Sequence, residues 1–333
     1  MLTIGYVTAR KDNQVRWFFD SLDRELGGRY GDVQIVVVDF WAEAQRSGEQ
    51  WTAAEASVRR GAYASRCKKP EVLRVVPPAP NVWQGPHRRT RDHFYAKSNA
   101  LNTAVMHAKG DQLLLLDDLS VLSVGFFKSV HEALRHPQRI TCFSFDKHDA
   151  MVVENGRIVS SRPKAPRPQD DRSYSGINPR VPAAWTYGGA ILVPMEVILT
   201  VNGWPQDCDG MRSQDSAFGI VAGNAGVPIA YDPRAIAIES ADRHAPPGGP
   251  VMRGCAEVVR NGRTRRDVFF EKCRSGLKRF SNYYGAGGLR QARAKVLAGA
   301  PVPTLLEPRT DWFTGATLER FEPSRPNNEL ART

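Results

Sequence analysis

Hydrophobic positions along the first half of the chain fall into strand-like and helix-like segments that alternate. Residues 2–8 alternate in polarity and are β-prone, and residues 15–26 form an amphipathic stretch. Residues 33–40 are a continuous β-branched run, which is typical of a parallel strand buried on both faces. Residues 94–108 have helical spacing, and residues 112–116 read as the next buried strand. This alternation predicts an open, mostly parallel sheet flanked by helices.

The middle of the chain adds a helix, a strand and a hairpin. Residues 125–134 have a helical pattern and residues 140–145 a strand pattern. Asn155-Gly156 separates two short strand-like runs, which predicts a hairpin with a type I′ turn. Residues 162–182 are rich in Pro, Arg, Asp and Ser without a period, which predicts a loop.

Regular structure is predicted again after Tyr187. The pattern indicates a short strand, a helix near residues 196–200, a helix that follows Ser213, and a strand over residues 227–231. Pro246-Pro247-Gly248-Gly249-Pro250 is the best linker candidate. We therefore expect a catalytic domain over residues 1–245 and a basic, mainly helical C-terminal region over residues 246–333.

Composition narrows the class of protein. Hydrophobic residues make up 41% and charged residues 24% of the 333 positions, which fits a globular protein. No apolar run reaches the ~20 residues of a membrane-spanning helix. The start of the chain lacks a signal-peptide pattern, and the five cysteines are scattered without metal-ligand spacing, so we expect reduced thiols and a cytoplasmic protein.

The first chemical motif is Asp117-Asp118, which follows the apolar run of residues 113–116. Ligands of open α/β sheets lie at the carboxyl ends of the strands. Adjacent carboxylates repel each other unless a cation or hydrogen-bond donors offset the cost, so a divalent metal is a natural partner. The alternative is that one acid caps the following turn while water solvates the other.

Two further motifs surround this one in the sequence. Lys97 and Asn99 lie on the helix before the acidic strand end, where they can reach a phosphate, base or ribose; on an amphipathic helix such residues more often face water. Gly188-Gly189 allows a ligand to approach the backbone closely. Ser213 can cap the next helix and place Asp215 in its first turn. Asp215 is then either an acid that is there only because the helix dipole favours acids at a helix start, or a general base.

Together these segments resemble the family 2-like glycosyltransferases of the GT-A superfamily. The resemblance covers about residues 1–245 and depends on the order of the motifs, which ends in Asn202-Gly203-Trp204 and Gln214-Asp215. It implies a GT-A fold, with a Rossmann-like sheet, that transfers a sugar from a nucleotide-sugar donor, a UDP-sugar in our prediction, to an acceptor hydroxyl.

The resemblance also implies a role for each matching residue. Asp215 is the expected base of an inverting transfer, Asp117 lies at the donor diphosphate, and Asp118 binds a divalent metal, Mn²⁺ or Mg²⁺, that neutralises the leaving group. The remaining expected donor-binding residues are Thr8, Ala9, Arg10, Asp39, Lys97, Asn99, Gly188 and Gly189.

The sequence departs from the family pattern at two positions. Leu119 stands where a third acid is common, so His244, at the position where some relatives supply a metal-binding histidine, is the second candidate metal ligand. Gln214 stands where Glu commonly precedes the base, which removes one charge and leaves Asp215 in place. The alternative for His244 is that water solvates it, as is more often the case for a lone histidine in a loop.

Charge points to a class of partner. The chain carries 46 Lys+Arg against 35 Asp+Glu, a net charge of +11, and much of it lies between Arg253 and Lys295. Aromatic residues are interleaved there, which is compatible with nucleic acid. This pattern predicts a polyanionic acceptor, in its most concrete form a hydroxymethylated base in DNA, so that the activity would be a DNA modification. Aromatic residues at helical spacing more often bury against a neighbouring domain.

Other readings of the sequence remain open. The acceptor can be a saccharide or a cell-envelope component. A nucleotidyltransferase also places acids beside a nucleotide, but residues 8–13 lack the glycines of a phosphate-binding loop. A nucleic-acid-binding protein with a non-catalytic α/β scaffold is the non-enzymatic alternative.

Overall fold

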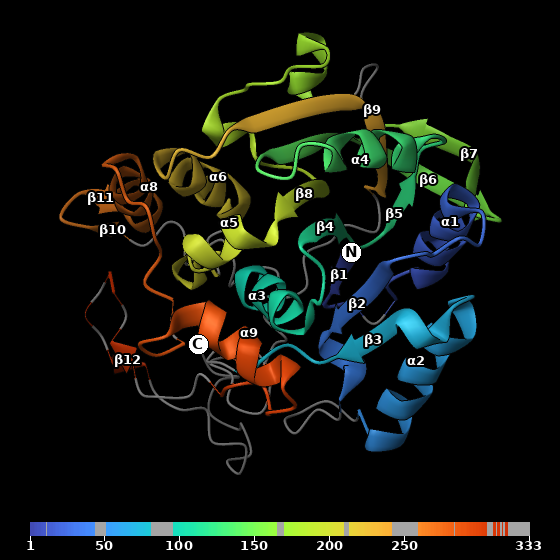
Figure 1. Cartoon of the computed structure of the whole chain (residues 1–333), viewed down its shortest axis with the longest axis horizontal. Helices are drawn as coiled ribbons and strands as arrows, with labels where there is room; N and C mark the ends of the chain where they lie inside the picture. The colour runs from blue at the N-terminus through green and yellow to red at the C-terminus, as the bar shows by residue number, and fades with distance from the viewer. Residues whose placement is uncertain are drawn as a thin grey trace, which may run out of the picture.

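In the computed structural model, a mixed sheet of nine strands forms the centre of the molecule (Figure 1). The structure describes residues 1–10, 12–43, 51–80, 96–164, 170–209, 213–241, 259–282, 284–304, 309–310, 312–313, 315 and 317–318. Within these residues the strand order is β3-β2-β1-β4-β8-β6-β9-β5, and β7 pairs with β6. The candidate linker at residues 246–250 and His244 lie outside the described residues.

The strands of this sheet are β1 (Leu2–Thr8), β2 (Val33–Asp39), β3 (Leu73–Val76), β4 (Gln112–Asp117), β5 (Ser120–Leu122), β6 (Ile140–Glu154), β7 (Arg157–Pro163), β8 (Ala190–Pro194) and β9 (Ile229–Ser240). The α-helices are α1 (Val15–Leu26), α2 (Ala53–Arg66), α3 (Lys97–His107), α4 (Phe126–Leu134), α5 (Met195–Thr200), α6 (Gln214–Asn224), α8 (Arg265–Arg274) and α9 (Gly288–Leu297).

Short elements complete the described structure. They are the 3₁₀ helices η1 (Phe40–Ala42), η2 (Pro70–Val72), η4 (Asp171–Ser175), η5 (Ala183–Trp185) and η6 (Gln206–Cys208), and the short strands β10 (Val259–Arg260), β11 (Arg263–Thr264), β12 (Arg309–Thr310) and β13 (Thr317–Leu318).

Helices cover the sheet on both faces, because apolar residues of the central strand β4 point to both sides. Leu113 and Leu115 of β4 pack into one hydrophobic cluster with residues of α3, α6, α8 and α9. Leu114 and Leu116 of the same strand point the other way, into a cluster with residues of α1, α2 and α4. A strand that buries both faces needs no polar alternation. The prediction of an α/β sheet flanked by helices is confirmed.

The sheet is less parallel than the sequence predicts. β1, β2, β3 and β4 pair in parallel, but β8 is antiparallel to both β4 and β6. β6 and β9 are parallel again. The chain enters β8 from residues 183–189 at the carboxyl edge of β4, so β8 runs back along its neighbour. This reversal carries Gly188-Gly189 to the end of β4.

The hairpin predicted at Asn155-Gly156 joins β6 to β7. Asn155 has φ 50° and Gly156 has φ 71°, the left-handed backbone that a type I′ turn requires at both central positions. A Cβ at Gly156 would overlap the backbone of Asp20 in α1. Arg24 of α1 donates a hydrogen bond to the Gly156 carbonyl. The turn is therefore packed against α1.

The C-terminal helices continue the core of the preceding residues. Helix α9 lies beside α3, and α8 beside α6 (Figure 1). Phe269 and Phe280 are buried in the cluster that also contains Trp204. For these two residues the structure favours the alternative of burial over contact with nucleic acid, because they are core residues. The division into domains at residue 245 stays a prediction.

Many cations of this region have partners within the protein. Arg265 is buried and lies over the Trp312 ring, with its guanidinium carbon 5.8 Å from the ring centre. Arg290 pairs with Glu196 at 2.5 Å, and Arg293 donates to the Ala108 carbonyl at 3.0 Å. Part of the basic cluster thus holds α8 and α9 to the fold. Among the described helices, none has the length and apolar character needed to cross a membrane.

Candidate active site

The carboxyl ends of β1, β2 and β4 bring predicted site residues into one row. In the parallel register Thr8 lies opposite Asp39, and Val7 lies opposite Asp117. Asp118 follows directly after β4, and its carboxylate accepts a hydrogen bond of 2.7 Å from the Thr8 hydroxyl. Residues 110 positions apart therefore meet at one edge of the sheet, where open α/β sheets hold their ligands.

Asp118 is held by cations and donors from β1 and the residues after it. The Arg10 guanidinium lies 3.1 Å from the Asp118 carboxylate, and each side chain keeps less than 15% of its surface exposed. Burial raises the pKa of Asp118, while Arg10 and the Thr8 hydroxyl act in the opposite direction. Ala9 contributes its carbonyl, which accepts a hydrogen bond of 2.9 Å from the Trp41 indole.

Asp39 is completely buried at the end of β2. Its carboxylate accepts hydrogen bonds from the Trp41 backbone N–H at 3.0 Å and from the Tyr63 hydroxyl at 2.8 Å, and it pairs with Arg59 of α2. Burial raises the pKa of Asp39, and Arg59 opposes this shift. Asp39 thus links β2 to α2. Its predicted contact with a nucleotide base stays a prediction.

Lys97 connects the acidic end of β4 to Asp215. The ammonium of Lys97, the first residue of α3, lies 2.8 Å from the Asp117 carboxylate and 3.5 Å from that of Asp215. Asp215 lies in the first turn of α6. Burial raises the pKa of Asp215, and Lys97 lowers it. The three segments that the sequence singles out therefore converge on one lysine.

A pocket of about 220 Å³ opens at this convergence. We call it the active-site pocket, and it is lined by Asp117, Phe145, Lys147, Gly188, Gly189, Asp215 and Glu239. Thr8, Ala9, Arg10, Asp39, Lys97, Asn99 and Asp118, also predicted site residues, are not among its lining residues. Of these, Lys97 contacts two of the lining carboxylates. Asp118 directly follows the lining residue Asp117 in the sequence.

Lys147 and Glu239 belong to the pocket but were not predicted from the sequence. They lie opposite each other on β6 and β9, and the Lys147 ammonium is 3.3 Å from the Glu239 carboxylate. Burial raises the pKa of Glu239 to about 7, the nearby Asp117 adds to this shift, and Lys147 opposes it. The available signal was the apolar run of residues 235–238, over which β9 continues beyond the predicted strand.

The paired glycines make room for neighbouring side chains. A Cβ at Gly189 would overlap the Glu239 carboxylate, so Gly189 allows Glu239 to reach the pocket. Gly188 has φ 103° and lies against Phe145 and Arg172. Arg172 is itself buried, pairs with the buried Asp170 at 2.7 Å and lies over the Tyr187 ring at 4.2 Å. The pocket wall therefore has a buried ion pair behind it.

The start of α3 is capped by a distant acid rather than by its own residues. The Asp209 carboxylate accepts hydrogen bonds from the backbone N–H groups of Ser98 at 2.8 Å and Asn99 at 3.2 Å. The Asn99 side chain is completely buried and donates to the Ala79 carbonyl at 2.7 Å. The prediction that Asn99 contacts the donor is not supported by this position, because its amide is used inside the protein.

Ser213 differs from its predicted role at the start of α6. Its φ is 63°, in the left-handed region, and its side chain makes no capping hydrogen bond. The hydroxyl instead accepts a hydrogen bond of 3.1 Å from Arg266 of α8. The prediction of a serine cap is wrong, although Asp215 lies in the first helical turn as expected.

The candidate metal ligands are only partly described. Asp118 is placed as above, and His244 lies outside the described residues. Within the part of the chain that the structure describes, no three His, Cys, Asp or Glu side chains are grouped as a metal site. When all four carboxylates (Asp117, Asp118, Asp215 and Glu239) are ionised, they and the three neighbouring cations (Arg10, Lys97 and Lys147) of this described group sum to 3 − 4, or −1. The oxygen donors and the excess negative charge fit a hard divalent cation.

Comparison with protein-family models and with curated proteins gives no match. Among solved structures, GalNAc-T7 in complex with UDP, GalNAc and Mn²⁺ is similar over 91% of this chain and 59% of its own, with a TM-score of 0.51 and 11% identity. The chain has a GT-A glycosyltransferase fold. The low identity limits this likeness to the fold.

Two other solved structures are similar at lower scores. The mannosyltransferase PcManGT from Pyrobaculum calidifontis, in complex with GDP-Man and Mn²⁺, matches over 90% of this chain and 76% of its own, with a TM-score of 0.46 and 17% identity. S. aureus TarS matches over 72% of this chain, with a TM-score of 0.48 and 13% identity. The chain spans 36% of the TarS chain and 59% of the GalNAc-T7 chain.

Proposed function

We propose that this protein is a glycosyltransferase that moves a sugar from a nucleotide-sugar donor to an acceptor hydroxyl. The observation that carries the proposal is the position of Lys97 between Asp117 and Asp215 at the carboxyl edge of the sheet. Lys97 thus connects Asp117, in the donor-binding half of a GT-A fold, with Asp215, at the start of α6 in the other half.

Asp215 serves as the general base in this proposal. It takes the proton of the acceptor hydroxyl while the hydroxyl oxygen attacks the anomeric carbon and the nucleoside diphosphate leaves, which inverts the configuration. A base must be ionised at the working pH and have a pKa near it. Burial raises the pKa of Asp215 toward that range, and Lys97 favours the ionised form.

Lys97 and the acids of β4 serve the donor. A positive charge beside the diphosphate compensates the charge that develops on the leaving group. Asp118, with His244 as the second proposed ligand, holds a divalent cation in this proposal, and the cation supplies further neutralisation of the diphosphate. The neighbours GalNAc-T7 and PcManGT contain Mn²⁺ together with UDP or GDP-mannose, which supports both the donor class and the metal.

The acceptor is a separate question. A hydroxymethylated base in DNA remains a prediction from the basic C-terminal region, and the burial of Phe269 and Phe280 removes part of its basis. A saccharide acceptor is the alternative. Sugar transfer to hydroxymethylated duplex, to saccharides and to protein, assayed side by side with one labelled donor, separates these acceptors.

Donor use is tested with a panel of nucleotide sugars, UDP-sugars first, with and without Mn²⁺. We expect one donor to raise the thermal stability in the presence of metal, because a ligand that binds only the folded state stabilises it. The same donor should be hydrolysed or transferred. If no nucleotide sugar shifts the unfolding temperature or is turned over, the proposed activity is wrong. Activity that is unchanged by EDTA would reject the metal and keep the transferase.

A further inference from the structure

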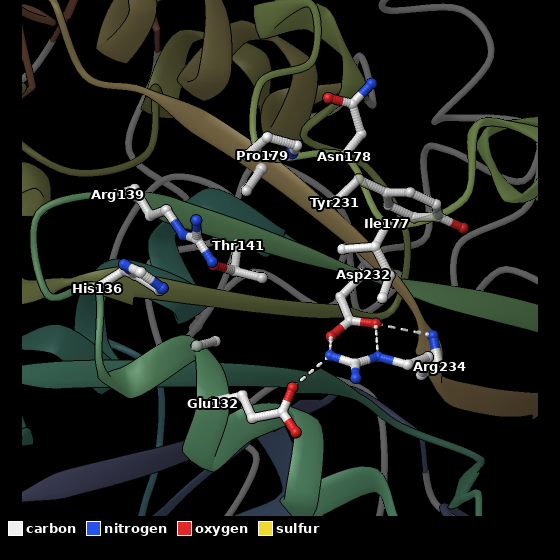
Figure 2. A pocket seen from close by; sticks show the side chains of 12 residues that line it. Glu132, His136, Arg139, Thr141, Ile177, Asn178, Pro179, Tyr231, Asp232 and Arg234 are labelled. Carbon is white, nitrogen blue, oxygen red and sulfur yellow. Dashed lines mark hydrogen bonds and ion pairs between the residues drawn. The ribbon is translucent and has the colours of Figure 1, made fainter.

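A second pocket lies along the same two strands, β6 and β9, nearer their first residues (Figure 2). It has a volume of about 290 Å³ and lies between the end of α4, the first residues of both strands, and residues 177–179. Thr141 lines this pocket and Lys147 lines the other, six positions along the same strand. At a rise of roughly 3.3 Å per residue, the two sites are about 20 Å apart.

One arginine forms ion pairs with both acids of this pocket. Arg234 lies 2.7 Å from the Asp232 carboxylate and 2.6 Å from that of Glu132. Its Nε also donates to Asp232 at 2.9 Å. Figure 2 shows these ion pairs together on one side of the pocket, away from Arg139. Both acids are therefore paired with Arg234, and neither lies within ion-pair distance of Arg139 in the described structure.

Arg139 and Thr141 line the other side, and each has a buried polar atom without a partner. The Arg139 Nε and the Thr141 hydroxyl are inaccessible to solvent and make no hydrogen bond within the described structure. The Thr141 side chain is 1% exposed. Burial lowers the pKa of Arg139, and Asp232 only partly opposes this. Buried polar groups without partners are costly and rare, so a missing ligand is the simplest explanation.

We infer that this pocket, which we call the Arg139 pocket, binds a phosphate group through Arg139 and Thr141. A guanidinium presents several N–H donors in a plane that matches phosphate oxygens, and a threonine hydroxyl adds one more donor. His136 lines the same side (Figure 2). The volume is about ten times the ~30 Å³ share of one water molecule, which leaves room for a phosphate that carries a small organic group.

The inference does not depend on the proposed activity, because the two pockets share no lining residue. The probe is inorganic phosphate, titrated by calorimetry into the full chain in chloride buffer. We expect saturable binding to the wild-type protein. Arg139→Met should weaken it by about tenfold or more, because it removes a charged donor. Thr141→Val, which keeps the shape, should weaken it by about threefold or more, and Thr141→Ser should restore it.

Two controls separate this site from others. Arg135→Met removes an exposed arginine near the end of α4, outside the pocket, and should leave phosphate binding unchanged. Lys97→Met alters the active-site cluster and should also leave it unchanged. Arg139→Lys guards against a folding defect, because it keeps the charge and should bind more tightly than Arg139→Met. The inference is wrong if the wild type does not bind phosphate saturably, or if binding survives Arg139→Met and is lost in Lys97→Met.

Discussion

The two pockets along β6 and β9 hold charges in different ways. Around the active-site pocket, Lys147 of β6 and Lys97 of α3 each lie within 3.5 Å of a pocket carboxylate. Around the Arg139 pocket, Arg234 contacts both acids, and Arg139 has no carboxylate within ion-pair distance in the described structure. In the first arrangement the charges are held in fixed positions, and such charges can stabilise the charge that develops during a reaction. In the second arrangement Arg139 lacks an anionic partner, which is what we expect of a site that binds a stable anion.

Asp215→Asn gives the sharpest test of this difference. The amide cannot take a proton, so we expect sugar transfer to fall by about 10³-fold, within the range for loss of a general base. Phosphate binding in the Arg139 pocket should not change. Single-turnover transfer with saturating donor measures the first effect. Asp111→Asn is the matched control, since this carboxylate is 88% exposed. Full activity in Asp215→Asn would remove Asp215 as the base.

Lys97→Met should lower transfer by about 10²-fold, because it removes one charge that opposes the developing diphosphate charge. Lys97→Arg keeps the charge and should recover part of the loss. Separate values of kcat and of KM for the donor distinguish a role in the reaction from a role in binding alone. An effect below about threefold would show that the lysine only compensates its neighbouring acids.

Asp209→Ala tests how the lysine is positioned. This change leaves the backbone N–H groups of Ser98 and Asn99 without an acceptor, and two such buried donors cost about 2–4 kcal/mol. Denaturant unfolding measures the loss. Transfer should also fall, because Lys97 precedes these two residues at the start of α3. A stability loss below about 1 kcal/mol would mean that water replaces the cap.

Glu239→Gln is expected to change the pH dependence of stability. Because the pKa of Glu239 is raised from its ordinary value of 4.5 to about 7, the folded state binds the proton more tightly than the unfolded state. The wild type should therefore lose stability relative to Glu239→Gln as the pH rises from about 4.5 to 7, by at most about 3 kcal/mol. Unfolding of both proteins from pH 4 to pH 8 measures this. Parallel curves would show an ordinary pKa.

The donor half of the site was predictable because its residues end recognisable strands. Asp117 follows four leucines and Thr8 ends an alternating segment, so the sequence places both at the carboxyl edge. Lys97 was also found, because it begins the helix before the acidic strand. Asn99 shows the limit of this reasoning: a polar residue on that helix faces the protein interior, and only the fold reveals its partner, Ala79.

The other half depends on pairing between strands that are distant in the sequence. Lys147 and Glu239 are 92 positions apart and meet only because β6 and β9 both continue past their predicted ends, at residues 145 and 231. The sequence pattern weakens there because those residues are half-buried and mixed in polarity. Arg172 lies in a segment predicted as a loop, and nothing in the local sequence indicates that it is buried.

Gly189 and Glu239 make a prediction about evolution. Because a side chain at position 189 would occupy the space of the Glu239 carboxylate, the two positions are constrained as one unit. Homologous chains that keep an acid at position 239 should keep glycine at position 189. Chains with a short residue at position 239 are free to carry alanine or serine at position 189, so the two columns of an alignment should covary.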